Sequence, residues 1–238
     1  MRRTPSPEAV HLLVIAKAPV PGRVKTRLCP PCTPVQAAAL AEAALRDTLA
    51  AVAATPAVRR TVVLDGPTGC WLPPGFGVLP QRGRGLDERL AAAFDDAWSC
   101  APLPLLLVGM DTPQVTPALL GAAVRQLLAP GTDAVLGPAR DGGWWALGLR
   151  RPDRRLLLGV PTSTAVTGAL QHDRLTAAAL RVADLCRLTD VDTVADAVQV
   201  AGLCHPSSRF ARAVGALSAA WPVPAQGSGL DRPLERRR

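Results

Sequence analysis

The 238-residue sequence has few aromatic residues, with no tyrosine and only three phenylalanines. Proteins that bind single-stranded nucleic acid stack the bases on aromatic side chains, so this shortage argues against a nucleic-acid partner. No window holds roughly 18 uninterrupted apolar residues, and the first ten residues lack the apolar stretch of a secretory signal. We therefore expect a cytoplasmic protein without a membrane span.

The sequence also lacks a regular cysteine framework. Its six cysteines are scattered through a chain too long to be a small disulfide-stapled scaffold. Cys29 and Cys32 have the two-residue spacing of a zinc or redox pair, but no second pair stands at ligand spacing, and Cys204 with His205 is a weak complement. We expect ordinary reduced thiols, with a structural zinc site as the alternative.

Acidic residues are outnumbered, because 27 Lys and Arg face 19 Asp and Glu, which gives a net charge of +8. With nucleic acid disfavoured, a phosphorylated small molecule is the anionic partner that we expect. The length and the apolar content of 48% fit one domain over residues 10–221. We expect residues 1–9 to be a flexible N-terminus and residues 222–238 to be a disordered basic tail.

Strand-like and helix-like segments alternate along this domain. Apolar runs typical of strands occur at 10–16, 60–64, 103–108, 133–136 and 144–149. Helical patterns occur at 34–54, 86–98, 117–129, 163–171, 174–184 and 193–203. Thr33 and Thr116 each precede a proline, which is a helix-start signal. The alternation predicts an α/β fold with a mainly parallel sheet covered on both faces, and its ligand should lie beyond the carboxyl ends of the strands.

A basic loop follows the first predicted strand. Its four cations and one glycine are Lys17, Arg23, Lys25, Arg27 and Gly22. Backbone amides and basic side chains in such a loop can bind a diphosphate, so we expect a nucleotide-phosphate site here rather than a solvated basic loop. The glycine spacing matches neither the P-loop nor the dinucleotide fingerprint.

Asp111 follows the apolar run at 103–108 and stands in the segment Gly-Met-Asp-Thr-Pro at 109–113. A carboxylate beside a phosphate site is repulsive unless a cation lies between them, which favours Mg²⁺ or Mn²⁺ held by Asp111. Capping of the following turn is the alternative role.

Two further aspartates are candidates. Asp141 precedes two glycines and the pair Trp144 and Trp145, which could line an acceptor pocket or belong to the core. Asp192 could be a second metal ligand, or it could, like Thr193, cap the following helix.

Together these motifs resemble the GT-A-type glycosyltransferase-like family that was first catalogued as a domain of unknown function and includes selenodomain-associated and arsenosugar-type transferases. The matching blocks are 16–28, 81–90 with Gly85 and Arg89, 109–113, Gly137-Pro138 with 141–143, 162–164 and 190–193. The resemblance implies a single-domain GT-A (Rossmann-like) three-layer sandwich with a mixed sheet, a nucleotide-sugar donor and a divalent metal. It also implies that Arg89 joins the nucleotide-binding residues.

These observations predict a metal-dependent glycosyltransferase-like enzyme that uses a nucleotide-diphosphate sugar and a small-molecule acceptor. Asp111 and Asp141 are its predicted catalytic residues, and Asp111 with Asp192 its metal ligands. One alternative is a nucleotidyltransferase that releases pyrophosphate from a nucleoside triphosphate, because the dense basic loop suits that chemistry. A non-catalytic nucleotide-binding protein is the other alternative.

Overall fold

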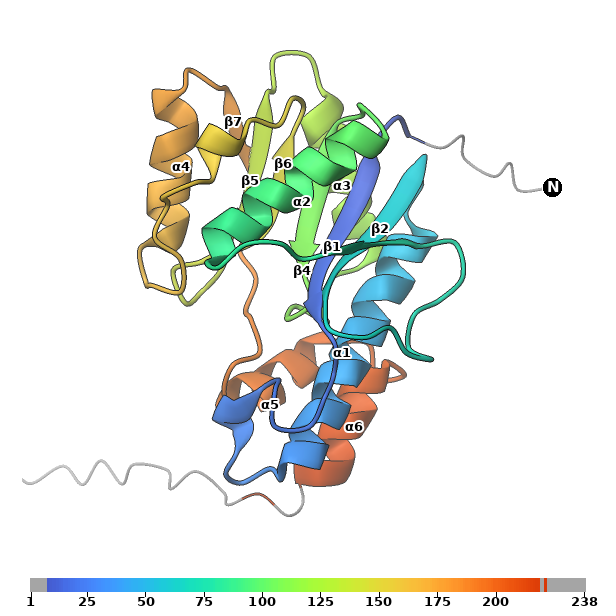
Figure 1. Cartoon of the computed structure of the whole chain (residues 1–238). Coiled ribbons are helices and arrows are strands. Elements are labelled where there is room, and N and C mark those ends of the chain that lie inside the picture. The colour runs from blue at the N-terminus through green and yellow to red at the C-terminus, as the bar shows by residue number, and fades with distance from the viewer. Residues whose placement is uncertain (1–7, 219–220, 222–238) are drawn as a thin grey trace, which may run out of the picture.

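Seven strands form one mixed sheet in the computed structural model, which describes residues 8–218 and 221 (Figure 1). The strands are β1 (His11–Lys17), β2 (Arg59–Asp65), β3 (Gly77–Pro80), β4 (Leu105–Gly109), β5 (Ala134–Pro138), β6 (Trp144–Leu149) and β7 (Val182–Asp184). Their order across the sheet is β3-β2-β1-β4-β6-β5-β7. β6 is antiparallel to both of its neighbours, and the other pairs are parallel. The predicted mainly parallel mixed sheet is confirmed.

Helices cover both faces of this sheet. They are α1 (Pro34–Ala54), α2 (Leu86–Cys100), α3 (Pro117–Leu128), α4 (Thr167–Ala177), α5 (Val194–Leu203) and α6 (Arg209–Ser218), with 3-10 turns η1 (Thr26–Leu28) and η2 (Arg154–Leu156). Successive strand residues point to opposite faces, and β1 shows the result. Leu12 and Val14 pack in the core beneath α1 and α3, whereas Leu13 packs in the core beneath α2. The three-layer α/β architecture is therefore as predicted.

Several helix starts follow the cap signals in the sequence. Thr33 accepts a hydrogen bond from the backbone amide of Gln36, whose side chain bonds back to Thr33, so α1 begins with a complete capping box. Thr116 caps α3 through the amide of Leu119. Thr193, one of the two cap candidates, forms a second capping box at the start of α5.

The two helices predicted at 163–171 and 174–184 are wrong. One helix, α4, replaces them, and the chain then turns into the edge strand β7. Ala179 ends the helical region with a left-handed φ of 59°, a conformation that usually selects glycine or asparagine and so gave no sequence signal here. Val182 then pairs in parallel with Ala134 of β5, a tertiary contact that outweighs the helical pattern.

The strand β3 and the helix α6 were not predicted. β3 is a short, mostly exposed edge strand that contains a glycine and ends in a proline. The start of α6 is capped by two residues: the Ser208 hydroxyl accepts a hydrogen bond from the backbone amide of Ala211 (3.1 Å), and Asp47 of α1 accepts from the amides of Arg209 (3.2 Å) and Phe210 (2.8 Å). Phe210 and Val214 are buried against the first half of α1 together with α5, as the grouping of these helices in Figure 1 shows.

The predicted flexible N-terminus and basic tail lie mostly outside the described residues. Only residues 8 and 9 of the first segment are described, and none of residues 222–238. Within the part of the chain that the structure describes, none of the helices combines the length and the apolar character needed to span a bilayer.

His11, at the start of β1, makes the stability of the fold depend on pH. The ring is fully buried and its Nε2 lies 2.8 Å from the Thr61 hydroxyl. Burial, followed by the nearby charge of Arg59, lowers the pKa of His11 from 6.5 to about 4. The unfolded chain therefore binds a proton at a higher pH than the folded chain does, so stability is lost as the pH falls from about 6.5 to about 4.

We expect a His11→Gln variant, which can keep the bond to Thr61 but cannot titrate, to lack this loss. Between about pH 7 and pH 4 the unfolding free energy of the unsubstituted protein should fall by roughly 3 kcal/mol more than that of the variant, at about 1.4 kcal/mol per pKa unit. Urea unfolding at a series of pH values measures this difference. Parallel curves for the two proteins would contradict the assignment.

Candidate active site

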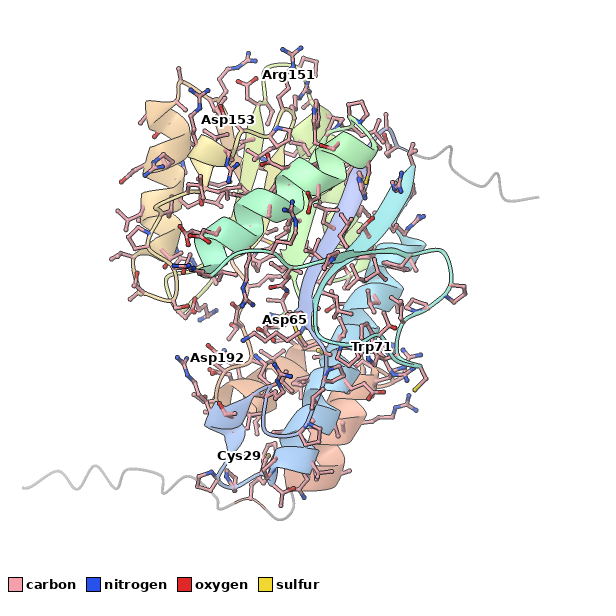
Figure 2. All side chains as sticks on the ribbon, viewed as in Figure 1. Cys29, Asp65, Trp71, Arg151, Asp153 and Asp192 are labelled. Carbon is pink, nitrogen blue, oxygen red and sulfur yellow. The ribbon has the colours of Figure 1, made fainter. Side chains whose placement is uncertain are left out.

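A cavity of about 830 Å³ lies at the carboxyl ends of the parallel strands, where the sequence predicted a ligand. The sheet order places the cavity's lining residues in a row along this edge. Gln81 follows β3, Lys17 ends β1, Asp111 follows β4 and Trp144 begins the antiparallel strand β6. Figure 2 shows Asp65 and Asp192 on this side of the molecule and Asp153 at the opposite end of the sheet.

Lys25 is the centre of the charged part of the cavity. Its ammonium Nζ lies 2.7 Å from Asp111 Oδ1 and 3.4 Å from Asp192 Oδ1, and it also donates to the Val191 carbonyl. The side chain is only 9% exposed. The backbone of Lys25 is left-handed, with φ of 49°, which turns the loop so that η1 begins directly after it. One buried cation therefore joins the loop after β1 to two segments far along the chain.

The charge of Lys25 is stabilised by its partners. Burial by itself lowers the pKa of Lys25, but the charges of Asp111 and Asp192 and the hydrogen bonds to them outweigh burial, so the net effect is a raised pKa. The ammonium thus stays protonated at neutral pH.

Asp111 and Asp192, the two predicted metal ligands, lie together around Lys25. Their side chains are 39% and 37% exposed, so both carboxylates are accessible from the cavity that they line. Arg27 Nη1 lies 3.4 Å from Asp192 Oδ2 and extends the charged cluster toward solvent. Within residues 8–218 and 221, no group of three His, Cys, Asp or Glu side chains is arranged to hold a metal ion.

Asp190 is a residue of the site that the sequence reasoning did not assign. Its carboxyl lines the cavity, and its Oδ1 is buried with no hydrogen-bond partner among the described residues. Burial, followed by the charges of Asp111 and Asp141, raises the pKa of Asp190 to about 7. The available signal was its two-residue spacing from Asp192, but the burial that sets Asp190 apart could not be seen in the sequence.

Of the other predicted residues of the basic loop, two line the cavity and one does not. Lys17 and Arg23 are exposed and line the cavity, and neither forms an ion pair within the described part of the chain. Gly22 does not line the cavity, and its φ of +77° serves the turn that carries the basic side chains.

Arg89 lies at the other end of the cavity, among residues that follow β2 and β3. Its Nη1 lies 2.9 Å from Asp65 Oδ2 and 3.4 Å from Gln81 Oε1. Gln81 and the exposed Arg84 line the same end of the cavity, and neither had been singled out as a candidate.

The loop between β5 and β6 holds Asp141 at the cavity rim. Asp141 Oδ1 accepts a hydrogen bond of 2.8 Å from the amide of Gly143, so the carboxylate shapes its own turn. A Cβ at Gly142 would lie 1.9 Å from the Ala165 carbonyl oxygen, which makes glycine obligatory there. Both tryptophans line the cavity, but they differ in burial. Trp144 is half-buried, whereas Trp145 is a core residue whose indole donates to the Cys186 carbonyl.

The cysteine pair lies outside this cavity. Cys32 is buried with Cys204 in the apolar cluster between α1, α5 and α6, and Cys29 packs against that cluster. All three thiols are free, and burial raises the pKa of Cys204 to about 11. A thiol in such surroundings is a packing group rather than a nucleophile.

Comparisons with known proteins agree with this fold. The model of the family described as "uncharacterized protein conserved in bacteria (DUF2064)" matches residues 38–164. The 2-phospho-L-lactate guanylyltransferase of Natrialba magadii is 33% identical over 203 residues, 80% of this chain and 83% of that protein. A structure from Desulfovibrio desulfuricans G20, provisionally described as a nucleotide-diphospho-sugar transferase, superposes with a TM-score of 0.81 at 26% identity over 89% of this chain and 96% of the other.

The expected resemblance to GT-A-type transferases is thereby confirmed, and the chain is a transferase-type enzyme similar to nucleotidyl- and nucleotide-sugar transferases. It belongs to the DUF2064 family and is homologous to 2-phospho-L-lactate guanylyltransferase.

Proposed function

We propose that this chain is a nucleotidyltransferase that transfers a nucleoside monophosphate from a triphosphate, with GTP as the donor, to an anionic small-molecule acceptor. The observation that carries the proposal is the 33% identity to a guanylyltransferase across 80% of the chain. This identity favours nucleotidyl transfer, which was an alternative in the sequence analysis, over glycosyl transfer.

The charge of the basic loop supports a triphosphate donor. Lys17 and Arg23 line the cavity together with Lys25, and Arg27 lines it from η1. A triphosphate carries more negative charge than the diphosphate of a sugar nucleotide, so it gains more from these cations. In this role the loop binds the donor and neutralises the charge that develops on departing pyrophosphate.

The residues at the centre of the cavity fit a divalent ion. Asp111 and Asp192 already converge on one cation, the Lys25 ammonium, and both remain partly exposed. Mg²⁺ commonly takes one or two protein carboxylates and completes its shell with phosphate oxygens and water, so this pair of hard ligands is sufficient. Bound there, Mg²⁺ or Mn²⁺ would supply further neutralisation of the phosphate charge.

The proposed reaction exchanges one bond at the α-phosphorus. An acceptor oxygen forms a bond to that phosphorus, and the bond to the oxygen bridging the α- and β-phosphates breaks, so pyrophosphate leaves with the electron pair. A phosphate or carboxylate acceptor is ionised at neutral pH and needs no general base. Asp141 then need not remove a proton, and its carboxylate, which accepts from the Gly143 amide, holds the turn at the acceptor end of the cavity.

Glycosyl transfer is a second candidate, favoured by the structural match to the Desulfovibrio protein. In that reaction the bond between sugar and diphosphate would break, and the product would be a nucleoside diphosphate. Because the two reactions cut different bonds, their products distinguish them.

We expect the protein, incubated with GTP and Mn²⁺, to release pyrophosphate when small phosphorylated hydroxy acids are offered as acceptors, and to leave sugar nucleotides intact. Chromatography of the nucleotide products, with a coupled pyrophosphate assay, measures both outcomes. Slow transfer to water would still show which bond is cut. A nucleoside diphosphate formed from a sugar nucleotide, with every triphosphate unchanged, would establish glycosyl transfer instead.

The predicted role of Asp111 gives a second test. Asp111→Asn removes the negative charge that the metal requires while keeping the shape of the side chain, so we expect the enhancement of GTP binding by Mn²⁺ to disappear. The preceding strand, β4, is held by buried apolar residues, so the fold should be retained. Titration calorimetry with and without Mn²⁺ gives the two dissociation constants.

Asp153→Asn is the matched control. Asp153 also pairs with a basic residue, Arg155, but it lies at the opposite end of the sheet (Figure 2). The control should bind GTP with the same metal dependence as the unsubstituted protein. Equal metal dependence in Asp111→Asn would remove Asp111 from the metal site.

A further inference from the structure

We propose that Gln81 and Arg89 form the subsite that recognises the base of the nucleotide, and that Arg89 binds the base edge rather than a phosphate. The choice of guanine as that base rests on the proposed function. The placement of the subsite rests on the geometry of the cavity.

The sheet order separates the two ends of the cavity. Gln81 follows β3, and the Lys25–Asp111 pair lies beyond β1 and β4. Three strand spacings of about 4.8 Å lie between β3 and β4, a separation of roughly 14 Å. A ligand whose phosphates lie at Lys25 and Asp111 can therefore extend its nucleoside toward Gln81 and Arg89, away from the acceptor end at Trp144.

Gln81 is held in one orientation. Its Nε2 donates to the Ala16 carbonyl at 2.9 Å and to the Val63 carbonyl at 3.2 Å, near the ends of β1 and β2. Because both neighbours are hydrogen-bond acceptors, only the amino group of the side chain can face them. The carbonyl Oε1 is thus fixed on the side of Arg89, where it accepts from Nη1 at 3.4 Å, and its second lone pair can accept from a ligand in the cavity.

Arg89 is held in place by its own set of partners. Asp65 Oδ2 accepts from Nη1 at 2.9 Å, and the Gly83 carbonyl accepts from Nε at 3.3 Å. Among the described residues Nη2 has no hydrogen-bond partner, although the side chain lines the cavity. The planar guanidinium therefore offers a fixed donor next to the fixed acceptor of Gln81.

Apolar side chains line the same end. Leu86 is the first residue of α2 and is 41% exposed, and it lines the cavity with Leu90 and Ile15. An exposed leucine at a cavity wall gains free energy when a flat apolar surface covers it. A base seated against these side chains would present its polar edge to Gln81 and Arg89.

The edge of guanine complements this pair. Its O6 accepts hydrogen bonds, and the adjacent N1–H and 2-amino groups donate them. Arg89 Nη2 would donate to O6, as arginine does in guanine recognition elsewhere. Gln81 Oε1, which already accepts from Arg89 Nη1 at 3.4 Å, would use its second lone pair to accept from N1–H or the 2-amino group. Adenine has a 6-amino donor where guanine has O6 and an N1 acceptor where guanine has N1–H, and it has no 2-amino group. It would therefore lose hydrogen bonds that guanine forms with Arg89 and Gln81.

Binding of GTP and ATP to Arg89 variants tests the proposal without requiring turnover. We expect the unsubstituted protein to bind GTP more tightly than ATP, and Arg89→Met to weaken GTP about tenfold while changing ATP less than about threefold. Arg89→Lys keeps the charge but loses the planar fork, so it should also lose most of the preference. Arg82→Met is the matched control, because Arg82 pairs with Asp96 outside the cavity and its loss should leave both affinities unchanged.

The outcomes separate the alternatives. Equal weakening of GTP and ATP in Arg89→Met, restored by Arg89→Lys, would show that Arg89 binds phosphate and would overturn the inference while leaving the proposed function standing. Equal affinity of the unsubstituted protein for both nucleotides would also overturn it. Thermal melting of each variant identifies one that fails to fold, and Arg89→Lys then decides the question. Binding of no triphosphate at all would instead overturn the proposed function.

Discussion

The ion pair between Lys25 and Asp111 is the contact on which the rest of the site depends. An ammonium with 9% exposure is costly to bury by several kcal/mol unless opposite charges face it, and here Asp111 and Asp192 both do. The left-handed backbone of Lys25 adds a cost on the order of 1–3 kcal/mol, which the same partners offset. The backbone amide of Val191 also bonds to the Asp111 carbonyl at 3.0 Å. The basic loop, the end of β4 and the segment before α5 are thereby fixed together.

The fold could be predicted wherever one local signal determined an element. α1 and α3 begin at threonine caps followed by proline, and β1 and β4 are continuous apolar runs, so their positions were close to the predicted ones. The errors lie where distant contacts decide. α6 has a local cap in Ser208, but its first amides also bond to the distant Asp47, and β7 exists only because β5 pairs with it. No local pattern contains these distant contacts.

The candidate site also contains residues that could be placed from the sequence and residues whose features depend on distant contacts. Residues at or just beyond the end of a buried strand, such as Lys17 and Asp111, could be placed at the cavity from the sequence, because parallel strands deliver their carboxyl ends to one edge. Arg89 was expected to join the residues that bind the nucleotide, but which part of the ligand it faces depends on its bond to Asp65, a residue of another element. The orientation of Gln81 is set by neighbouring backbone carbonyls, and Asp190 is set apart by its burial. Both features arise only when the chain is folded.

The antiparallel strand β6 gives the two ends of the cavity different surroundings, as the two substrates of the proposed reaction require. Because β6 runs opposite to β4 and β5, it begins rather than ends at the edge that carries the cavity. The tight turn from β5 therefore lies at this edge and places Asp141 and Trp144 beside the charged cluster, where a parallel strand would have carried a long crossover. At the other end, beyond the parallel strands β1 to β3, the cavity is lined by residues from the first turns of α2. In the proposed reaction, a donor bound along the parallel half of the sheet would direct its reacting phosphate toward an acceptor at the antiparallel half.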